Sequence, residues 1–331
     1  MRPPTQRPVL AVLLCLALAP GLWWRALDSE GERTGNLTVE PLPLDAHREE
    51  NGLTVAGVWL LQSDDRRFSG YSALIVQGDG RLRAFSDTSR WLEFDPPDRS
   101  PAPAARFGRV PGYELSGHND LEAATHDAAS GVTWLAFEHI NSVRRIGPGE
   151  DDAVSAAPPA MAGFPRNGGA ETLVRLADGR FVVIAEAGEW RHPLRRTALL
   201  FARDPTIDAR ATAFSFKSPA GWDPTDAALL PDGRVLILLR GLAPGAWPPF
   251  KSKLVVADPA DIRPGEAWPW REVADLSGLV PPENYEGLAV AQGPSGLELW
   301  LIADANRSVV MQRTLLVKLV WNEPAGAGRA R

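Results

Sequence analysis

The sequence predicts an all-β fold, a β-propeller of five blades, from three observations. A unit recurs five times, in which an apolar strand opened by a polar residue is followed by a glycine-containing turn and a second apolar strand. The openers at positions 72, 122, 171, 226 and 286 are 50, 49, 55 and 60 residues apart, a spacing typical of propeller blades. No segment keeps a helical period, and 30 glycines and 30 prolines interrupt the chain.

Each copy of the unit begins with a β-hairpin. In the first four copies Asp-Gly or Ser-Gly stands between two apolar runs, and the glycine accepts the positive φ that a tight hairpin turn requires. The predicted hairpins therefore cover residues 71–87, 121–138, 170–186, 225–240 and 285–304.

Weaker strands after each hairpin complete a four-stranded antiparallel sheet, but the fifth copy ends near Trp321 after only three strands. We expect residues 55–62 to supply the missing outer strand, so that pairing of the two chain ends closes the ring. Residues 37–42 are a candidate edge strand, and six blades remain an alternative if residues 37–62 contribute more than one strand. The Ala/Pro-rich segments 153–165 and 241–250 are expected to be surface loops.

The N-terminal residues predict export. Arg2 and Arg7 precede an apolar run at residues 9–19, which is typical of a signal peptide and indicates a periplasmic or secreted protein. The same run is an alternative membrane anchor if it is not cleaved, although it falls short of the roughly 20 residues that span a bilayer. The expected organisation is a signal or anchor at 1–26, a linker at 27–51, a propeller at 52–322 and a disordered tail at 323–331.

Composition limits the partners of the protein. The net charge is -6, the sequence pI is about 5.5 and no basic cluster occurs, so nucleic acid is not an expected partner. A membrane is expected as a partner only through an uncleaved N-terminal segment, and the oligomeric state stays open. The single cysteine, Cys15, lies within the apolar run, which leaves the mature chain without a disulfide.

Acidic residues recur at both ends of the predicted hairpins. In an antiparallel hairpin the first residue of one strand and the last residue of the other lie at the same end of the sheet. If the first strand of each blade is innermost, these residues surround one mouth of the channel. The openers are Ser72, Glu122, Glu171, Asp226 and Glu286, and the closers are Asp87, Glu138, Glu186, Arg240 and Asp304.

Eight of these ten positions are carboxylates, and neighbouring carboxylates raise one another's pKa unless a cation neutralises them. Arg240 is one candidate cation, and a bound metal ion is another. Oxygen ligands without cysteine favour Ca²⁺ before Mg²⁺. Alternatively, each acid accepts backbone N–H groups or an arginine from the next blade and only builds the ring. Among the five histidines, blade geometry brings His118 and His139 toward the mouth.

Several segments together resemble a bacterial family described as phytase-like, with esterase-like activity of phytase. They are DLEAA at 120–124, WLAFE at 134–138, GAETL at 169–173, PTDAALLPDGRVL at 224–236, NYEGLAV at 284–290 and QRTLL at 312–316. The resemblance covers roughly residues 53–321. It implies an exported propeller with phosphoester or ester hydrolase activity. Ala305 departs from the family pattern, in which a second acid tends to stand beside the position of Asp304.

The resemblance implies functional roles for most of the mouth positions and for Asn306 and Arg313. We therefore expect a hydrolase that acts on a small anionic or ester substrate, and the alternative is a non-enzymatic envelope propeller whose acids are structural. The candidate catalytic residues are Glu122, Glu138, Glu286 and His118. The candidate substrate-binding residues are Arg240, Arg313 and Asn306. The candidate Ca²⁺ ligands are Glu171, Glu186, Asp226 and Asp304.

Overall fold

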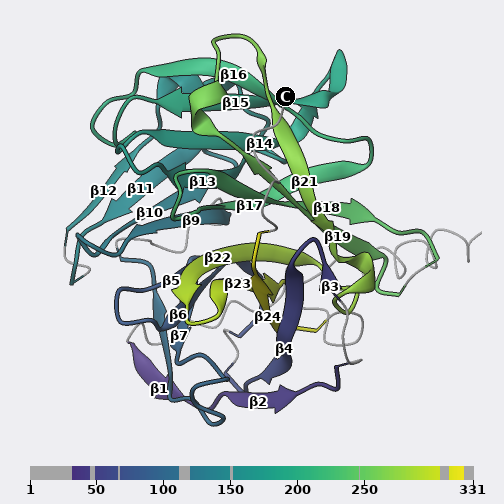
Figure 1. Cartoon of the computed structure of the whole chain (residues 1–331). Coiled ribbons are helices and arrows are strands. Elements are labelled where there is room, and N and C mark those ends of the chain that lie inside the picture. The colour runs from purple at the N-terminus through teal and green to yellow at the C-terminus, as the bar shows by residue number, and fades with distance from the viewer. Residues whose placement is uncertain are drawn as a thin grey trace, which may run out of the picture. The chain divides into compact units, whose positions relative to one another are not determined.

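A computed structural model describes residues 32–44, 49–65, 68–111, 120–149, 152–245, 247–305 and 313–323. Its contacts separate residues 1–31, which lie outside the described part, from a compact unit that begins at Glu32. This unit is a five-bladed β-propeller (Figure 1), as the repeat predicts. Among the described residues, no helix is long and apolar enough to cross a membrane.

The five blades are antiparallel sheets, whose strands follow one another from the inside of the ring outward. Blade 1 contains β5 (Tyr71–Val76), β6 (Leu82–Ser86), β7 (Arg90–Phe94), β8 (Ala105–Arg109) and β1 (Arg33–Gly35). Blade 2 contains β9 (Leu121–Asp127), β10 (Val132–Phe137), β11 (Ser142–Ile146) and β12 (Ala153–Ala156). Blade 3 contains β13 (Ala170–Arg175), β14 (Phe181–Glu189), β15 (His192–Phe201), β16 (Ala211–Lys217) and, parallel to β16, β20 (Ala267–Trp268).

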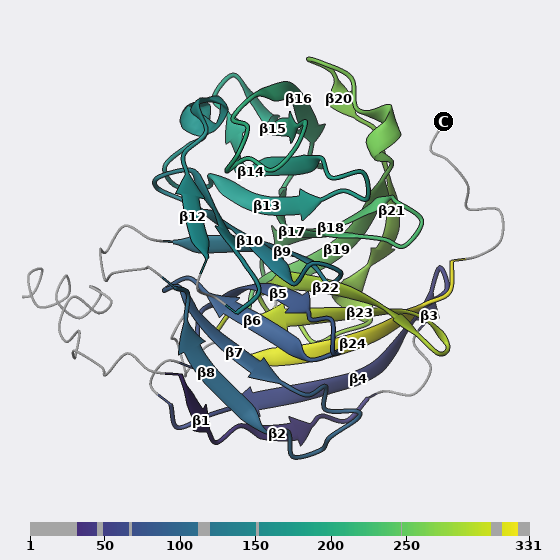
Figure 2. The ribbon, with the colours of Figure 1, turned by 90° about the vertical axis from the view of Figure 1, so that its left-hand side faces the viewer.

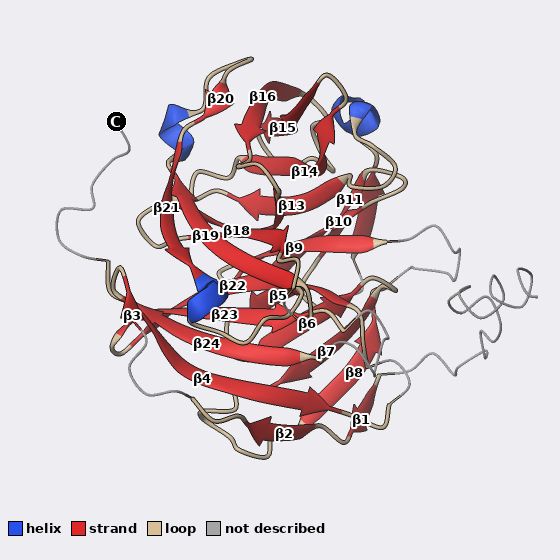
Figure 3. Ribbon diagram, turned by 90° about the vertical axis from the view of Figure 1, so that its right-hand side faces the viewer, coloured by secondary structure: helices blue, strands red, loops and turns tan. Residues whose placement is uncertain are grey.

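The remaining two blades complete the ring. Blade 4 contains β17 (Trp222–Leu229), β18 (Val235–Leu242), β19 (Phe250–Ala257) and β21 (Trp270–Asp275). Blade 5 contains β22 (Tyr285–Gly293), β23 (Gly296–Ala303), β24 (Leu315–Trp321), β4 (Leu53–Gln62) and β2 (Thr38–Pro41), and β3 (Glu49–Glu50) also pairs with β4. Strands dominate Figure 3. The helical segments of the described residues are short: η1 (Pro159–Gly163), η2 (Pro259–Asp261) and η3 (Leu276–Gly278).

The first strand of every hairpin is the innermost strand of its blade. Each of these strands contacts the corresponding strand of the next blade, and β22 of blade 5 contacts β5 of blade 1, so the inner ring is closed. Five clusters of buried apolar side chains each join two adjacent blades. Trp134 and Trp300, which hold equivalent positions in the repeat, both lie in these clusters.

The ring is closed in the predicted way. β4 pairs antiparallel with β24, in a register that places Leu60 opposite Leu315 and Leu53 opposite Trp321. The chain that precedes β4 adds a second connection, because β1 pairs with β8 of blade 1 and β2 pairs with β4 of blade 5 (Figure 2). Residues 37–62 therefore contribute three strands, and all three join blade 5 instead of forming a sixth blade.

The structure differs from the sequence expectations at three segments. The expected linker at 27–51 contains β1, β2 and β3, which are short strands that pair with outer edges. The expected loop at 153–165 contains β12 and η1. Glu323, placed in the expected tail, accepts a hydrogen bond of 3.0 Å from Arg234. Short edge pairings of this kind leave little hydrophobic pattern in the sequence.

A buried charge on β4 should open the ring. Val58 is 2% exposed in the core between blades 4 and 5, whereas Ala56 on the same strand is exposed. We expect Val58→Asp to lower the free energy of unfolding by about 3 kcal/mol or more, because the carboxylate would be buried without a partner. Ala56→Asp, the matched control, should change it by less than about 0.5 kcal/mol. Urea titration measures both, and equal effects would contradict the assigned closure.

Candidate functional site

A β-bulge stands at the same position of every innermost strand. In each blade one residue of the inner strand is skipped in the pairing with the second strand, which leaves it out of the ladder and redirects its side chain. The skipped residues are Ser72, Glu122, Glu171, Thr225 and Glu286. Four of the five predicted openers are thus equivalent in the structure, and in blade 4 the equivalent residue is Thr225 instead of Asp226.

Asp226 does not lie at the mouth position that the sequence predicts for it. It pairs opposite Leu238, one residue beyond the bulge, and a shift of one residue in a strand moves a side chain to the other face. Asp226 is fully buried, and its two carboxylate oxygens accept hydrogen bonds from the backbone N–H groups of Ala227 (2.8 Å) and Leu288 (2.7 Å). Because Leu288 belongs to β22, Asp226 joins blade 4 to blade 5. This is the structural role that the sequence left open for the acids.

The closers lie beside the openers, as the hairpin geometry predicts. The backbone N–H groups of Asp87, Glu138 and Asp304 each donate a 2.8 Å hydrogen bond to the carbonyl two residues before the opener. Glu186 makes the equivalent bond at 3.0 Å, and Arg240 pairs opposite Asp223. Openers and closers therefore share one end of the ring, which we call the mouth.

Arg240 connects three blades at the mouth. Its guanidinium donates hydrogen bonds to Glu186 on β14 and to Glu286 on β22, and a third of 3.0 Å to the side-chain oxygen of Asn284. The side chains of Arg240, Glu186 and Glu286 are 23%, 20% and 14% exposed, so all three are mostly buried. Burial alone would lower the pKa of Arg240, but the charges of Glu286, Glu186 and Glu171 outweigh it and raise the pKa.

Glu122 and Glu171 occupy the mouth without such a partner. Among the described residues, no side chain donates a hydrogen bond to either carboxylate. Burial raises the pKa of Glu122 well above its ordinary value, and repulsion from Glu171, Asp120, Glu286 and Glu138 adds to this. Burial also raises the pKa of Glu171 well above its ordinary value, and Glu186 and Glu286 raise it further.

The pKa values of Glu186 and Glu286 are raised less. Burial raises both, but Arg240 opposes the shift in each, and Asn284 also opposes it at Glu286. The mouth cluster, defined as Glu122, Glu138, Glu171, Glu186, Glu286 and Arg240, therefore contains two kinds of carboxyl group. Arg240 opposes the rise in pKa at the two carboxyl groups that it contacts, whereas Glu122 and Glu171 favour the protonated form more strongly.

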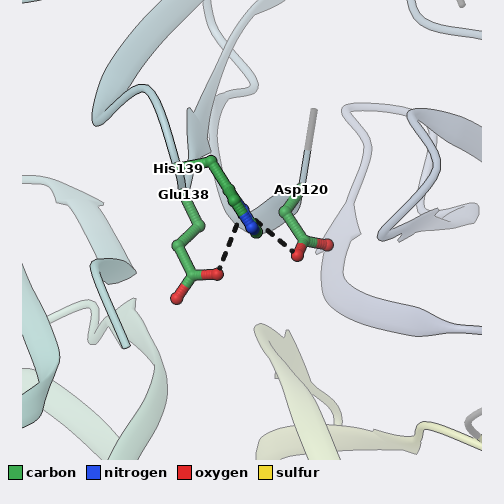
Figure 4. A group of neighbouring side chains, drawn as sticks. All are labelled: Asp120, Glu138 and His139. Atoms are coloured by element: carbon green, nitrogen blue, oxygen red, sulfur yellow. Dashed lines mark ion pairs between the residues drawn. The ribbon is translucent and has the colours of Figure 1, made fainter. Parts of the chain in front are cut away.

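Glu138 links blade 2 to the loop that leads into blade 3. Its Oε1 accepts hydrogen bonds from the backbone N–H groups of Gly168 and Gly169, the latter at 3.0 Å. Its Oε2 lies 3.4 Å from Nδ1 of His139, and Oδ2 of Asp120 lies 3.5 Å from the same nitrogen. Figure 4 shows the His139 ring between the two carboxylates.

The family of the chain follows from comparison with known proteins. The model of the family described as "Phytase-like: Esterase-like activity of phytase" matches residues 66–307, well over half of the chain. The chain belongs to this phytase-like family. No curated protein sequence matches the chain.

Solved structures similar to this phytase-like chain show low identity. Virginiamycin B lyase from Staphylococcus aureus is 12% identical, with a TM-score of 0.44, and the match covers 86% of this chain and 100% of that chain. A luciferin-regenerating enzyme is 12% identical, with a TM-score of 0.42, covering 88% of this chain and 95% of that one. The Cps50 (Swd1) β-propeller domain of Myceliophteria thermophila is 11% identical, with a TM-score of 0.39, and the match covers 84% of this chain and 99% of that chain.

The other candidate residues of this phytase-like propeller are placed as follows. Arg313 donates a 2.8 Å hydrogen bond to the buried carboxylate of Glu283 instead of reaching the mouth cluster. Asp304 is 4% exposed, and its backbone N–H donates a 2.8 Å hydrogen bond to the carbonyl of Asn284. His118 and Asn306 lie outside the described residues.

Sequence reasoning gave no role to Asn284, although it bridges Arg240 and Glu286. A signal for it exists, because the residue two positions before the skipped residue is polar in three blades. These residues are Asp120, Asp223 and Asn284. Their backbones or side chains all take part in the mouth. Glu283, the partner of Arg313, does not stand at a position that recurs among the blades, so the repeat does not predict its role.

Removal of the Arg240 charge should destabilise the propeller in a pH-dependent way. We expect Arg240→Met to lower the free energy of unfolding by about 3 kcal/mol at pH 8, because Glu186 and Glu286 would stay buried without their cation. Arg210→Met is the matched control, since the Arg210 side chain is 83% exposed, and it should leave stability unchanged.

The pH dependence has a defined sign. Without Arg240 the pKa of both glutamates in the folded protein rises further above the unfolded value of 4.5. The variant therefore loses free energy of unfolding only at pH values at which the carboxyl groups ionise in the unfolded chain. The penalty is absent below pH 4.5 and grows as the pH rises through the folded pKa. Urea titrations at pH 5 and pH 8 should show a smaller loss at pH 5, and equal losses would contradict the ion-pair assignment.

Proposed function

We propose that this phytase-like propeller is a hydrolase that cleaves a carboxyl ester or phosphoester at the mouth cluster. The observation that carries the proposal is that carboxyl groups at one mouth have pKa values raised to different degrees, well above the ordinary value at Glu122 and Glu171 and less at Glu286, which Arg240 contacts. Pairs of acids whose environments separate their pKa values are typical of general acid and general base assignments. The family match agrees with this reaction class.

The roles follow from the partners of each carboxyl group. Glu286, held by Arg240 and Asn284, is the general base that accepts a proton from water as the water oxygen attacks the acyl or phosphoryl centre. Protonated Glu122 is the general acid that gives its proton to the departing alcohol oxygen. Glu122 regains a proton and Glu286 loses one when the two exchange with solvent, which restores the starting state.

The charge of the substrate affects how readily it approaches this mouth. Five glutamates face one arginine, and the guanidinium of Arg240 is already hydrogen-bonded to three side chains. A neutral ester therefore approaches more readily than a phosphate dianion. A phosphoester would need an additional cation to offset the negative charge.

We propose Ca²⁺ binding with fewer ligands than the four that the sequence predicts. Asp226 uses both oxygens on backbone N–H groups and Glu186 is held by Arg240, so the four expected Ca²⁺ ligands do not form one site. Glu171 stays a candidate ligand, because burial and the charges of Glu186 and Glu286 raise its pKa well above its ordinary value. Bound calcium would supply positive charge next to a phosphoryl group. Its test is the thermal midpoint of wild type and Glu171→Gln with Ca²⁺ or EDTA.

We also propose that the protein is exported. The N-terminal arginines followed by the apolar run at residues 9–19 support this. N-terminal sequencing of protein recovered from its native cells tests it, and a cytoplasmic chain that retains these residues would contradict it.

A second candidate function is that of a non-enzymatic envelope propeller. It is favoured by Asp226 and Glu138, which bind backbone N–H groups of neighbouring blades and so build the ring. In this case the acids serve folding alone, and ligands would bind through the loops.

A substrate panel separates the two functions. We expect purified protein to hydrolyse nitrophenyl acetate, nitrophenyl butyrate or nitrophenyl phosphate. Glu286→Gln should lower kcat by about 10²–10⁴-fold, because the general base is lost. Glu266→Gln, at an exposed acid that directly precedes β20, is the control and should retain full activity. Absence of turnover on all substrates by folded wild-type protein, or full activity of Glu286→Gln, would contradict the proposed hydrolase.

A further inference from the structure

Three potential metal ligands converge at the edge of the mouth. Nδ1 of His139 lies 3.4 Å from Oε2 of Glu138 and 3.5 Å from Oδ2 of Asp120. One potential ligand atom from each of the three residues lies within 4.8 Å of the other two. The backbone fixes this arrangement, because the N–H of Glu138 donates a 2.8 Å hydrogen bond to the carbonyl of Asp120. Asp120 directly precedes β9, and the other two residues directly follow β10.

A second observation concerns the hydrogen bonding of the His139 ring. Nδ1 of His139 is buried from solvent and, among the described residues, has no hydrogen-bond partner. Both carboxylates lie near it, but neither has the direction that a hydrogen bond requires. A buried polar atom without a partner is uncommon, and an unseen ion is one of its recognised causes.

The spacing of the three atoms fits a metal ion better than an ion pair. Zinc binds nitrogen and carboxylate oxygen at about 2.0–2.2 Å, so tetrahedral angles place neighbouring ligand atoms about 3.3–3.6 Å apart. The two distances from His139 fall in this range. These two distances therefore allow one ion to contact the His139 nitrogen together with each carboxylate oxygen.

The environment of Glu138 orients it as a ligand. Its side chain is 7% exposed, and its Oε1 is held by the N–H groups of Gly168 and Gly169. The other oxygen, Oε2, is thereby directed toward His139. A side chain at Gly169 would disturb this support, because a Cβ there would lie 3.2 Å from Cγ of Glu138 and 2.5 Å from the Asn141 oxygen. Outer hydrogen bonds of this kind are typical of metal ligands.

We propose that Asp120, Glu138 and His139 bind a divalent transition-metal ion, with Zn²⁺ as the best-fitting ion. An imidazole ligand disfavours Ca²⁺ and Mg²⁺, which prefer oxygen donors throughout. Three protein ligands leave a fourth position for water, as in catalytic zinc sites. The site lies beside Glu122, since the charges of Asp120 and Glu138 both act on that residue. Metal binding at these three residues does not depend on the proposed hydrolysis.

Calorimetric titration of untagged, chelator-treated full-length protein with Zn²⁺ tests the proposal. Wild type should bind one equivalent, and His139→Gln and Asp120→Asn should each weaken binding by at least 10-fold. His126→Gln is the matched control, because His126 hydrogen-bonds Thr133 within blade 2, and it should bind as wild type does. Co²⁺ in place of Zn²⁺ should give visible absorption bands of a low-coordinate site, and His139→Gln should abolish them.

Several outcomes would overturn the assignment. Equal Zn²⁺ affinity of wild type and His139→Gln would mean that the ion binds elsewhere. Binding of Ca²⁺ without binding of Zn²⁺ or Co²⁺ would exclude an imidazole site. If circular dichroism shows that a variant is unfolded, the Co²⁺ spectrum of wild type still decides, because absence of any visible band contradicts the site. Metal titration does not require turnover, so a failed hydrolase test leaves this result intact.

Discussion

The contact of Arg240 with Glu186 and Glu286 is the interaction on which the mouth of this propeller depends. One guanidinium on blade 4 reaches carboxylates on blade 3 and blade 5. Its charge offsets part of the effect of burial, which raises the pKa of both acids. Glu122 and Glu171 lack hydrogen bonds from Arg240, and the difference between the two pairs is the basis of the proposed acid and base roles.

The repeat serves both the ring and the site. A bulge at the same position of each inner strand places Glu122, Glu171 and Glu286 at the mouth. In blades 4 and 5 the next residue along the strand faces the neighbouring blade. In blade 4 it is Asp226, which binds the N–H of Leu288, and in blade 5 it is Gly287, where a Cβ would lie 2.9 Å from the nitrogen of Leu74. In these blades the skipped residue lies at the mouth, and the residue after it packs against the neighbouring blade.

Much of this could be predicted from sequence, because hairpins are local. The glycine turns and apolar runs locate all five hairpins, and antiparallel geometry then brings openers and closers together. The assignment of Asp226 was wrong in register, because the position of a bulge depends on pairing that Pro224-Thr225-Asp226 does not reveal. The pairing of Arg313 with Glu283 and the approach of Asp120 to His139 depend on loops, whose tertiary contacts leave no periodic signal.

The protonation state of each mouth glutamate can be measured by ¹³C NMR of the glutamate side-chain carboxyl carbons. The structure predicts two carboxyl groups that stay protonated well above the ordinary value of 4.5, with one signal lost in Glu122→Gln and the other in Glu171→Gln. Arg240→Met should move the signals of Glu186 and Glu286 toward the protonated form. Titration of every glutamate near 4.5 in wild type would contradict the account.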